Sequence, residues 1–150
     1  MAIIGLRLIM KRYHGTDSLS ADNILKNINV SKGRGELGQG FYVGNLAHQA
    51  AIWAYKKGNQ NHTGYSVICF EICDCDFANL NRKYLTKKQA KDKRKELRRA
   101  RTQHTYRFNV DAIVAPIVGR YIPHFMQIKF EGNNGESFIN NTRKYELWKD

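Results

Sequence analysis

A glycine-rich stretch limits what this chain can fold into more than any other part of the sequence. Three glycines occur within residues 35–40, and Phe41-Tyr42-Val43 follows at once. Glycines let a backbone turn tightly and pass close to a bound molecule, whereas an aromatic and β-branched run favours a strand. An alanine-rich helical pattern comes next, over residues 46–57, with Asn45 as its expected N-cap. The sequence therefore predicts a loop, a short strand and a helix, with the Tyr42 ring at the exit of the loop.

The other elements favour one α+β domain over residues 1–150, because short strands and modest helices follow one another without a βαβ rhythm. A chain of this length can bury a core without disulfides. Strands are expected at 1–14, 66–73, 111–118 and 125–130, and helices at 20–28, at 46–57 and from residue 87. Turns are expected at Gly15-Thr16-Asp17 and Gly132–Gly135, and edge strand pieces at Phe138-Ile139 and Tyr145–Trp148.

Cysteine usage indicates a reducing compartment, and we expect the protein to be cytoplasmic. Cys69, Cys73 and Cys75 are odd in number and closely spaced in one apolar segment, unlike a disulfide framework. They share strand parity and lack a fourth ligand, so we expect buried thiols and no metal. Residues 1–10 are apolar but too short to cross a bilayer and lack the features of a signal peptide, so no membrane association is expected.

Tyr13-His14-Gly15-Thr16 lies upstream of the glycine-rich stretch. Together with Gly-x-Gly-Phe-Tyr at 38–42 and the alanine-rich helix, it resembles the ADP-ribosyltransferases of the diphtheria-toxin and poly(ADP-ribose) polymerase clade. The resemblance extends from Tyr13 to about Phe130, with a gap in the middle. It implies a split, two-sheet core that grips NAD as a substrate.

The resemblance also implies roles for individual residues. His14 would hold the NAD ribose, Tyr42 would stack on nicotinamide, and the main chain of Gly15 would pair with the nicotinamide amide. Taken singly, His14 would be a satisfied strand histidine and Tyr42 a core aromatic. The residues expected to contact NAD are Tyr13, His14, Gly15, Thr16, Gly40, Phe41, Tyr42 and Tyr55.

The third catalytic position of the clade is often a glutamate, and here the late strand carries Gln127 instead. Glu131 and Glu136 are the alternatives, in or near a turn expected to be mobile. A glutamine can bond the ribose 2′-hydroxyl but cannot offset oxocarbenium charge as a carboxylate does. Gln127 therefore favours single transfers over chain building, or a carboxylate that arrives from elsewhere.

Positive charge is concentrated in residues 81–107, which we expect to form a basic helical insertion. The chain carries a net charge of +12, and this segment holds 12 Lys and Arg against Asp92 and Glu96, a net of 12 − 2 = +10. Thr86 to Gln89 reads as a capping box, so a protruding helix should start there. Such density favours a nucleic-acid partner over a solvated face or an acidic protein. The expected contacts are Lys87, Lys88, Lys91, Arg94, Lys95, Arg98, Arg99 and Arg101.

These observations together predict a mono-ADP-ribosyltransferase that acts on RNA or DNA, as an intracellular toxin or defence effector with a neutralising protein partner. Three alternatives stay open. The acceptor could be a protein, or the chain could be a non-catalytic nucleic-acid-binding module on a degenerate transferase fold. An RNA 2′-phosphotransferase, which shares the fold and NAD, fits less well because its set of arginines and histidines is not found in these motifs.

Overall fold

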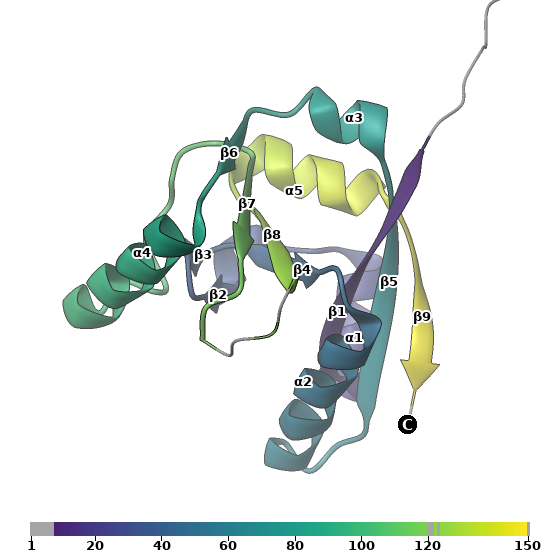
Figure 1. The fold of residues 1–150 in the computed structure, drawn as a ribbon. Coiled ribbons are helices and arrows are strands. Elements are labelled where there is room, and N and C mark those ends of the chain that lie inside the picture. The colour runs from purple at the N-terminus through teal and green to yellow at the C-terminus, as the bar shows by residue number, and fades with distance from the viewer. Residues whose placement is uncertain (1–7, 120–121, 123, 150) are drawn as a thin grey trace, which may run out of the picture.

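The computed structural model describes residues 8–119, 122 and 124–149 and has the α+β architecture that the sequence predicts. Within these residues the chain forms a mixed seven-stranded sheet, a two-stranded hairpin and five α-helices (Figure 1). The order of the strands in the large sheet is β6-β7-β8-β4-β1-β5-β9. The expected strand near the N-terminus begins at Ile9, and residues 1–7 lie outside the described part.

The strands and helices agree with most of the expected spans. The strands are β1 (Ile9–Asp17), β2 (Arg34–Gly35), β3 (Gly38–Gln39), β4 (Phe41–Gly44), β5 (Tyr65–Cys73), β6 (Arg82–Tyr84), β7 (Ala112–Pro116), β8 (Met126–Phe130) and β9 (Arg143–Lys149). The helices are α1 (Ser18–Lys26), α2 (Ala47–Gln60), α3 (Asp74–Ala78), α4 (Lys87–Ala100) and α5 (Gly132–Asn141), with a 3₁₀ turn at Val30–Lys32.

The large sheet is narrowest between β1 and β4. Strand β1 pairs with β5 along its whole length, from Ile9 to Asp17, but with β4 only through Tyr13 and Gly44. The sheet therefore consists of two halves, β6-β7-β8-β4 and β1-β5-β9, that meet at one residue pair. All described pairings in this sheet are antiparallel except that of β6 with β7.

Each side of the sheet carries its own hydrophobic cluster. On one side, Phe41, Phe70 and Phe130 pack with residues of α1, α3 and α5, and we call it the α5 side. On the other side, Ala90 of α4 packs with residues of β7 and with Leu37, which lies between β2 and β3. We call this the α4 side. Successive strand residues point to opposite sides, so Phe41 and its neighbour Tyr42 belong to different clusters.

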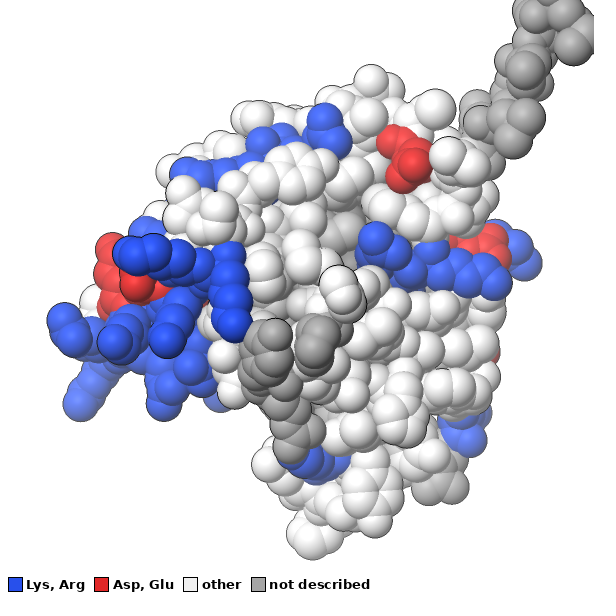
Figure 2. Space-filling view, viewed as in Figure 1, with Lys and Arg blue, Asp and Glu red and all other residues white. Residues whose placement is uncertain are grey.

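Helix α4 begins where the sequence predicts, with Thr86 and Gln89 forming a capping box. Its buried residues are Ala90 and Leu97, which anchor it lightly to the sheet. The helix protrudes at the left of Figure 1, and in Figure 2 lysine and arginine side chains gather over it. The expected basic insertion is not helical throughout, because Arg82–Tyr84 form the edge strand β6 beside β7.

Both expected turns are wrong. Gly15, Thr16 and Asp17 continue β1, because their backbone pairs with β5 as far as Asp17 and Tyr65. The Asp17 carboxylate then caps α1 by accepting from the backbone N–H of Ser20. The segment Gly132–Gly135 is the first turn of α5.

Three smaller expectations are also corrected. Phe138 and Ile139 lie in α5 and pack on the α5 side, so they are not an edge strand. Asn45 does not cap α2, because its side chain bonds the backbone of His124 and Met126, and Leu46 is the N-cap. Cys75 is exposed on α3, although Cys69 is buried as expected.

Across residues 8–119, 122 and 124–149, no helix is both long and apolar enough to cross a membrane.

Candidate functional site

His14 on β1 is held against β4 by two contacts. Its Nδ1 lies 2.6 Å from the carbonyl oxygen of Tyr42, and its ring stacks on Phe41 with the centroids 4.4 Å apart. A carbonyl oxygen only accepts, so Nδ1 carries the hydrogen and Nε2 keeps its lone pair. Burial lowers the pKa of His14, the bond to Tyr42 opposes this, and the positive charge of Lys57 adds to it. The imidazole is therefore a neutral group whose Nε2 can accept a hydrogen bond.

The ring of Tyr42 lies on the opposite side of the sheet from His14. His14 stacks on Phe41 on the α5 side, whereas Tyr42 packs into the cluster of the α4 side. The Tyr42 hydroxyl donates to the carbonyl of Gly38 and accepts from the N–H of Leu37 at 3.1 Å. Burial raises the pKa of this hydroxyl, so it stays protonated. Tyr42 thus anchors the β2–β3 hairpin, and the stacking role implied by the resemblance stays a prediction.

Glycines allow that anchoring. A Cβ on Gly35 would lie 2.7 Å from the Tyr42 ring, so the hairpin can cover this ring only because residue 35 has no side chain. In the described structure the glycine-rich stretch therefore packs over the Tyr42 ring, which stays partly exposed.

Gln127 on β8 lies on the same side as Tyr42 and next to a carboxylate that the sequence did not assign to the site. Its Nε2 donates to Glu36 at 3.1 Å and to the carbonyl of Pro116 at 3.3 Å. Glu36 also accepts from the N–H groups of Val118 and Gly119. The sequence offered one signal for a role of Glu36 in the site. This glutamate lies within the run of glycines that directly precedes Tyr42.

The two glutamates considered as alternatives have structural partners. Glu131 is 1% exposed and lies 2.6 Å from Nζ of Lys129, which is also fully buried. Glu136 accepts from the N–H of Val30 at 3.0 Å. The expectation that these residues sit in a mobile turn is therefore wrong, because α5 and its N-terminal residue are packed.

The remaining residues expected to contact NAD are dispersed. Gly15 faces α2, where a Cβ would lie 1.9 Å from the carbonyl oxygen of Ala50. Thr16 is buried, and Tyr13 pairs with Gly44 at the narrow point of the sheet. Gly40 is also buried, and its N–H bonds the carbonyl of Gly33. Tyr55 is exposed on α2 with its ring edge against Tyr65.

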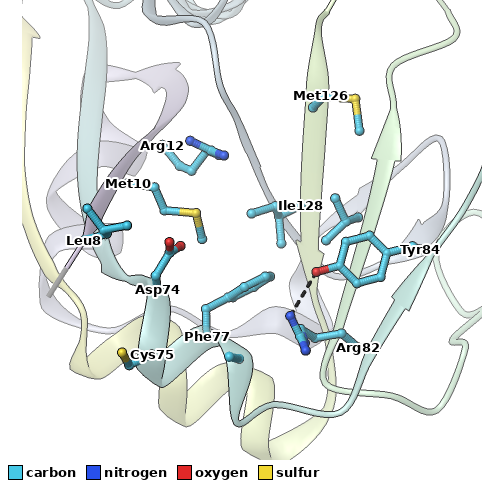
Figure 3. Close-up of a pocket in the computed structure, with 12 residues that line it drawn as sticks. Leu8, Met10, Arg12, Asp74, Cys75, Phe77, Arg82, Tyr84, Met126 and Ile128 are labelled. Carbon is cyan, nitrogen blue, oxygen red and sulfur yellow. Dashed lines mark hydrogen bonds between the residues drawn. The ribbon is translucent and has the colours of Figure 1, made fainter.

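A groove of about 590 Å³ opens on the α5 side, between the two halves of the sheet (Figure 3). One wall carries Met10 and Arg12 of β1, and the other carries Arg82 and Tyr84 of β6. Val114, Met126 and Ile128 of β7 and β8 contribute apolar surface, and α3 contributes Phe77. Arg12 and Arg82 lie on opposite sides of the groove, with Phe77 and Ile128 between them. We call it the arginine groove.

His14 follows Arg12 by two residues on β1, so both point to the side on which the arginine groove opens. Burial lowers the pKa of Arg12, and the nearby carboxylate of Asp74 opposes this shift. An arginine stays charged in proteins, so Arg12 is a cation within the groove. The sequence analysis did not assign Arg12 to the site, although this residue precedes Tyr13 and His14 directly. The other polar lining comes from α3 and β6, more than 60 residues further on.

The cations of α4 fall into two groups. Lys88 pairs with Asp92 at 3.0 Å, Lys93 with Glu96 at 2.8 Å, and Arg94 with Glu36 at 3.5 Å. The second group consists of exposed residues whose side chains have no ion pair or hydrogen bond with the described part of the chain: Lys91, Lys95, Arg98 and Arg99. Arg101 is exposed at the C-cap, and Lys87 is exposed in the first turn.

No group of three His, Cys, Asp or Glu side chains within the described residues could hold a metal ion. No protein-family model matches the sequence, and a comparison with curated proteins finds no match.

Proposed function

We propose that this chain is an NAD-dependent ADP-ribosyltransferase. One observation carries the proposal: the two motifs of the resemblance, whose key residues are 28 positions apart, lie on adjacent strands and are joined by the bond from His14 to the Tyr42 carbonyl. They meet where the sheet is narrowest, beside the arginine groove. A divided sheet is also what the resemblance implies.

The proposed reaction breaks the bond between nicotinamide N1 and ribose C1′. Both electrons of that bond go to the nicotinamide, which leaves as a neutral ring, and the ribose acquires oxocarbenium character, as in glycoside cleavage. A nucleophilic oxygen or nitrogen of the acceptor then bonds to C1′ and releases its proton. His14 suits the ribose, because Nε2 of a neutral imidazole can accept from a ribose hydroxyl. Phe41 and the Tyr42 carbonyl hold the ring in that orientation.

The arginine groove fits a dinucleotide substrate by size and chemistry. Its volume of about 590 Å³ lies within the range of ligand sites. Arg12 supplies a cation for the diphosphate, because a guanidinium bonds phosphate oxygens in pairs. Met10, Met126 and Ile128 supply apolar surface against which a planar ring can pack.

Release of nicotinamide from labelled NAD tests the proposal. His14→Ala should lower turnover by about 10²-fold, the usual loss when one positioned polar group is removed from a reacting centre. His48→Ala is the matched control, since His48 is an exposed histidine on α2, and it should keep full turnover. Wild-type turnover in His14→Ala would remove this residue from the site. Arg12→Gln should raise KM more than it lowers kcat, because a diphosphate contact acts on binding.

A second candidate function is a nucleic-acid-binding module without catalysis. The cover over the Tyr42 ring favours it, because the hairpin occupies the face on which nicotinamide would stack. In that case the protein would bind oligonucleotides but release no nicotinamide from NAD under any condition.

The toxin or defence role also belongs to this proposal. Induced expression of the chain in bacterial cells should stop growth, and His14→Ala should restore it at equal protein level. Growth arrest that persists in His14→Ala would separate toxicity from transfer chemistry.

A further inference from the structure

Helix α4 presents a cationic stripe that its own acidic residues do not neutralise. Lys91, Lys95 and Arg98 follow the i, i+4, i+7 spacing of one helical face, and Arg99 lies beside them. Asp92 and Glu96 are used by Lys88 and Lys93. We call Lys91, Lys95, Arg98 and Arg99 the basic stripe. Its free charge is complementary to a chain of phosphates.

Tyr84 is an exposed aromatic residue on the rim of the arginine groove. Its side chain is in the groove lining although the residue is 60% exposed. Arg82 donates from Nη1 to the Tyr84 hydroxyl at 2.9 Å, and its guanidinium lies 5.7 Å from the centre of the Tyr84 ring. The aromatic face is thus held at the surface with a cation beside it (Figure 3).

The stripe and the rim are close in the chain. Lys87, the first residue of α4, follows Tyr84 by three positions, so their Cα atoms lie within about 11 Å. Tyr84 pairs with Val114 and so faces the α5 side, whereas α4 packs on the α4 side. Strand β6 is the edge of the sheet, so a nucleic-acid strand bound along α4 reaches the Tyr84 ring by passing around this edge.

We propose that the basic stripe and Tyr84 bind single-stranded nucleic acid, with phosphates on the stripe and one base stacked on Tyr84. The claim that this strand accepts ADP-ribose rests on the proposed function. The claim that the strand binds at this surface does not. The base on Tyr84 would lie at the mouth of the groove in which NAD is expected to bind.

The exposed ring is what favours a single strand over a duplex. A stacking platform needs the flat face of a base, which a duplex buries between neighbouring pairs. Positive charge alone would attract both forms. RNA and DNA share the phosphates and the base faces, so the structure assigns the class of ligand, and the experiment distinguishes the two.

Fluorescence anisotropy with labelled 12-mers tests the inference on the full chain. The probes are single-stranded RNA, single-stranded DNA of the same sequence, and the DNA duplex. Tyr84→Leu should weaken binding of a single strand by about 5- to 150-fold, the usual loss of one stacked base, and leave duplex binding unchanged. Tyr84→Phe should bind as the wild type does, because it keeps the ring. Equal single-strand affinity in wild type and Tyr84→Leu would show that no base stacks on Tyr84 and would overturn this part of the proposal.

The basic stripe is tested by its salt dependence. The quadruple change of Lys91, Lys95, Arg98 and Arg99 to Gln should reduce the slope of log K against log salt by about 3, at roughly 0.7 per phosphate of a single strand. The matched control changes four exposed lysines outside α4 to Gln: Lys11, Lys26, Lys32 and Lys56. It should keep most of the slope. Equal losses in the two variants would show attraction by net charge and overturn the assigned site.

The outcomes distinguish a failure of this binding proposal from a failure of the proposed transferase function. Oligonucleotide binding with the predicted dependence on Tyr84, but without nicotinamide release, would keep the ligand and reject the transferase. Nicotinamide release with no oligonucleotide binding would keep the transferase and reject this acceptor. Transfer of label to protein in preference to RNA and DNA would likewise keep the transferase and reject nucleic acid as its acceptor.

Discussion

Arg94 of α4 lies 3.5 Å from the carboxylate of Glu36, which also accepts a hydrogen bond from Gln127 of β8. Both side chains of this ion pair are partly shielded from water, at 34% and 20% exposed. The basic helix is thus joined to the interior strand β8 by a polar link, in addition to the packing of Ala90 and Leu97. Glu36 is the residue on which the link depends, because it contacts three separate segments.

Glu36→Ala should lower the free energy of unfolding by about 2–3 kcal/mol. The change leaves the N–H groups of Val118 and Gly119 without their carboxylate and removes the partner of Arg94. Urea denaturation measures the loss. Glu96→Ala is the control on α4, because its ion pair with Lys93 is more exposed, and it should change stability by less than about 0.5 kcal/mol. Equal losses would mean that Glu36 is only a surface carboxylate.

Gly15→Ala should destabilise the fold by at least about 3 kcal/mol, because the new Cβ would lie 1.9 Å from the carbonyl oxygen of Ala50 in α2. A calorimetric or urea-denaturation measurement decides between this reading and a role of Gly15 in binding NAD. Gly132→Ala is the control, since it adds a Cβ in open space at a positive φ and should cost about 1 kcal/mol. Unchanged stability with lost NAD turnover would favour the binding role.

Local signals in the sequence were sufficient for several elements. Strand β5 is apolar on both faces and lies between two paired neighbours, and α4 begins at a capping box. Each of these features depends on residues that are close in the chain, where pattern and propensity act directly.

The features that the sequence could not predict depend on packing between residues that are far apart in the chain. Gly132–Gly135 has the composition of a turn, yet α5 forms there because Ile139 is buried and Gly135 fits against the carbonyl of Asp111. The opposite orientations of His14 and Tyr42 follow from how β4 aligns with β1, which alternation within one strand does not reveal. The arginine groove likewise joins β1, α3 and β6, and no single motif marks it.

The stability of the fold should fall with acidity in a way that depends on His14. Burial lowers the pKa of His14 in the folded state, so below about pH 6.5 the unfolded chain binds more protons there. The contribution of the neutral imidazole is therefore complete above about pH 6.5 and declines as the pH falls below it. Urea midpoints between pH 7.5 and pH 5 should decrease less steeply in His14→Gln than in wild type. The other four histidines are exposed, and identical pH dependences would assign the effect to them or to carboxylates.

Gln127→Glu should make stability depend on pH in the opposite sense. The new carboxylate would take the place of an amide nitrogen that lies 3.1 Å from Glu36, and two carboxylates so close do not both ionise readily. One of the pair should then have a pKa in the folded state above its unfolded value of about 4.3. Stability is therefore greatest in acid and is lost as the pH rises through that raised pKa, so the urea midpoint should be lower at pH 8 than at pH 5.

The exchanged pair, Glu36→Gln with Gln127→Glu, is the decisive control for this prediction. It restores one amide and one carboxylate, so it should abolish the pH dependence of the single variant. Arg94 lies next to Glu36 and would still face a polar group in the exchanged pair. If Gln127→Glu is instead as stable at pH 8 as at pH 5, Gln127 does not face Glu36 in solution. Its side chain would still lie on the α4 side of the sheet, opposite His14 and the arginine groove, so this outcome would not support the ribose role that the resemblance implies.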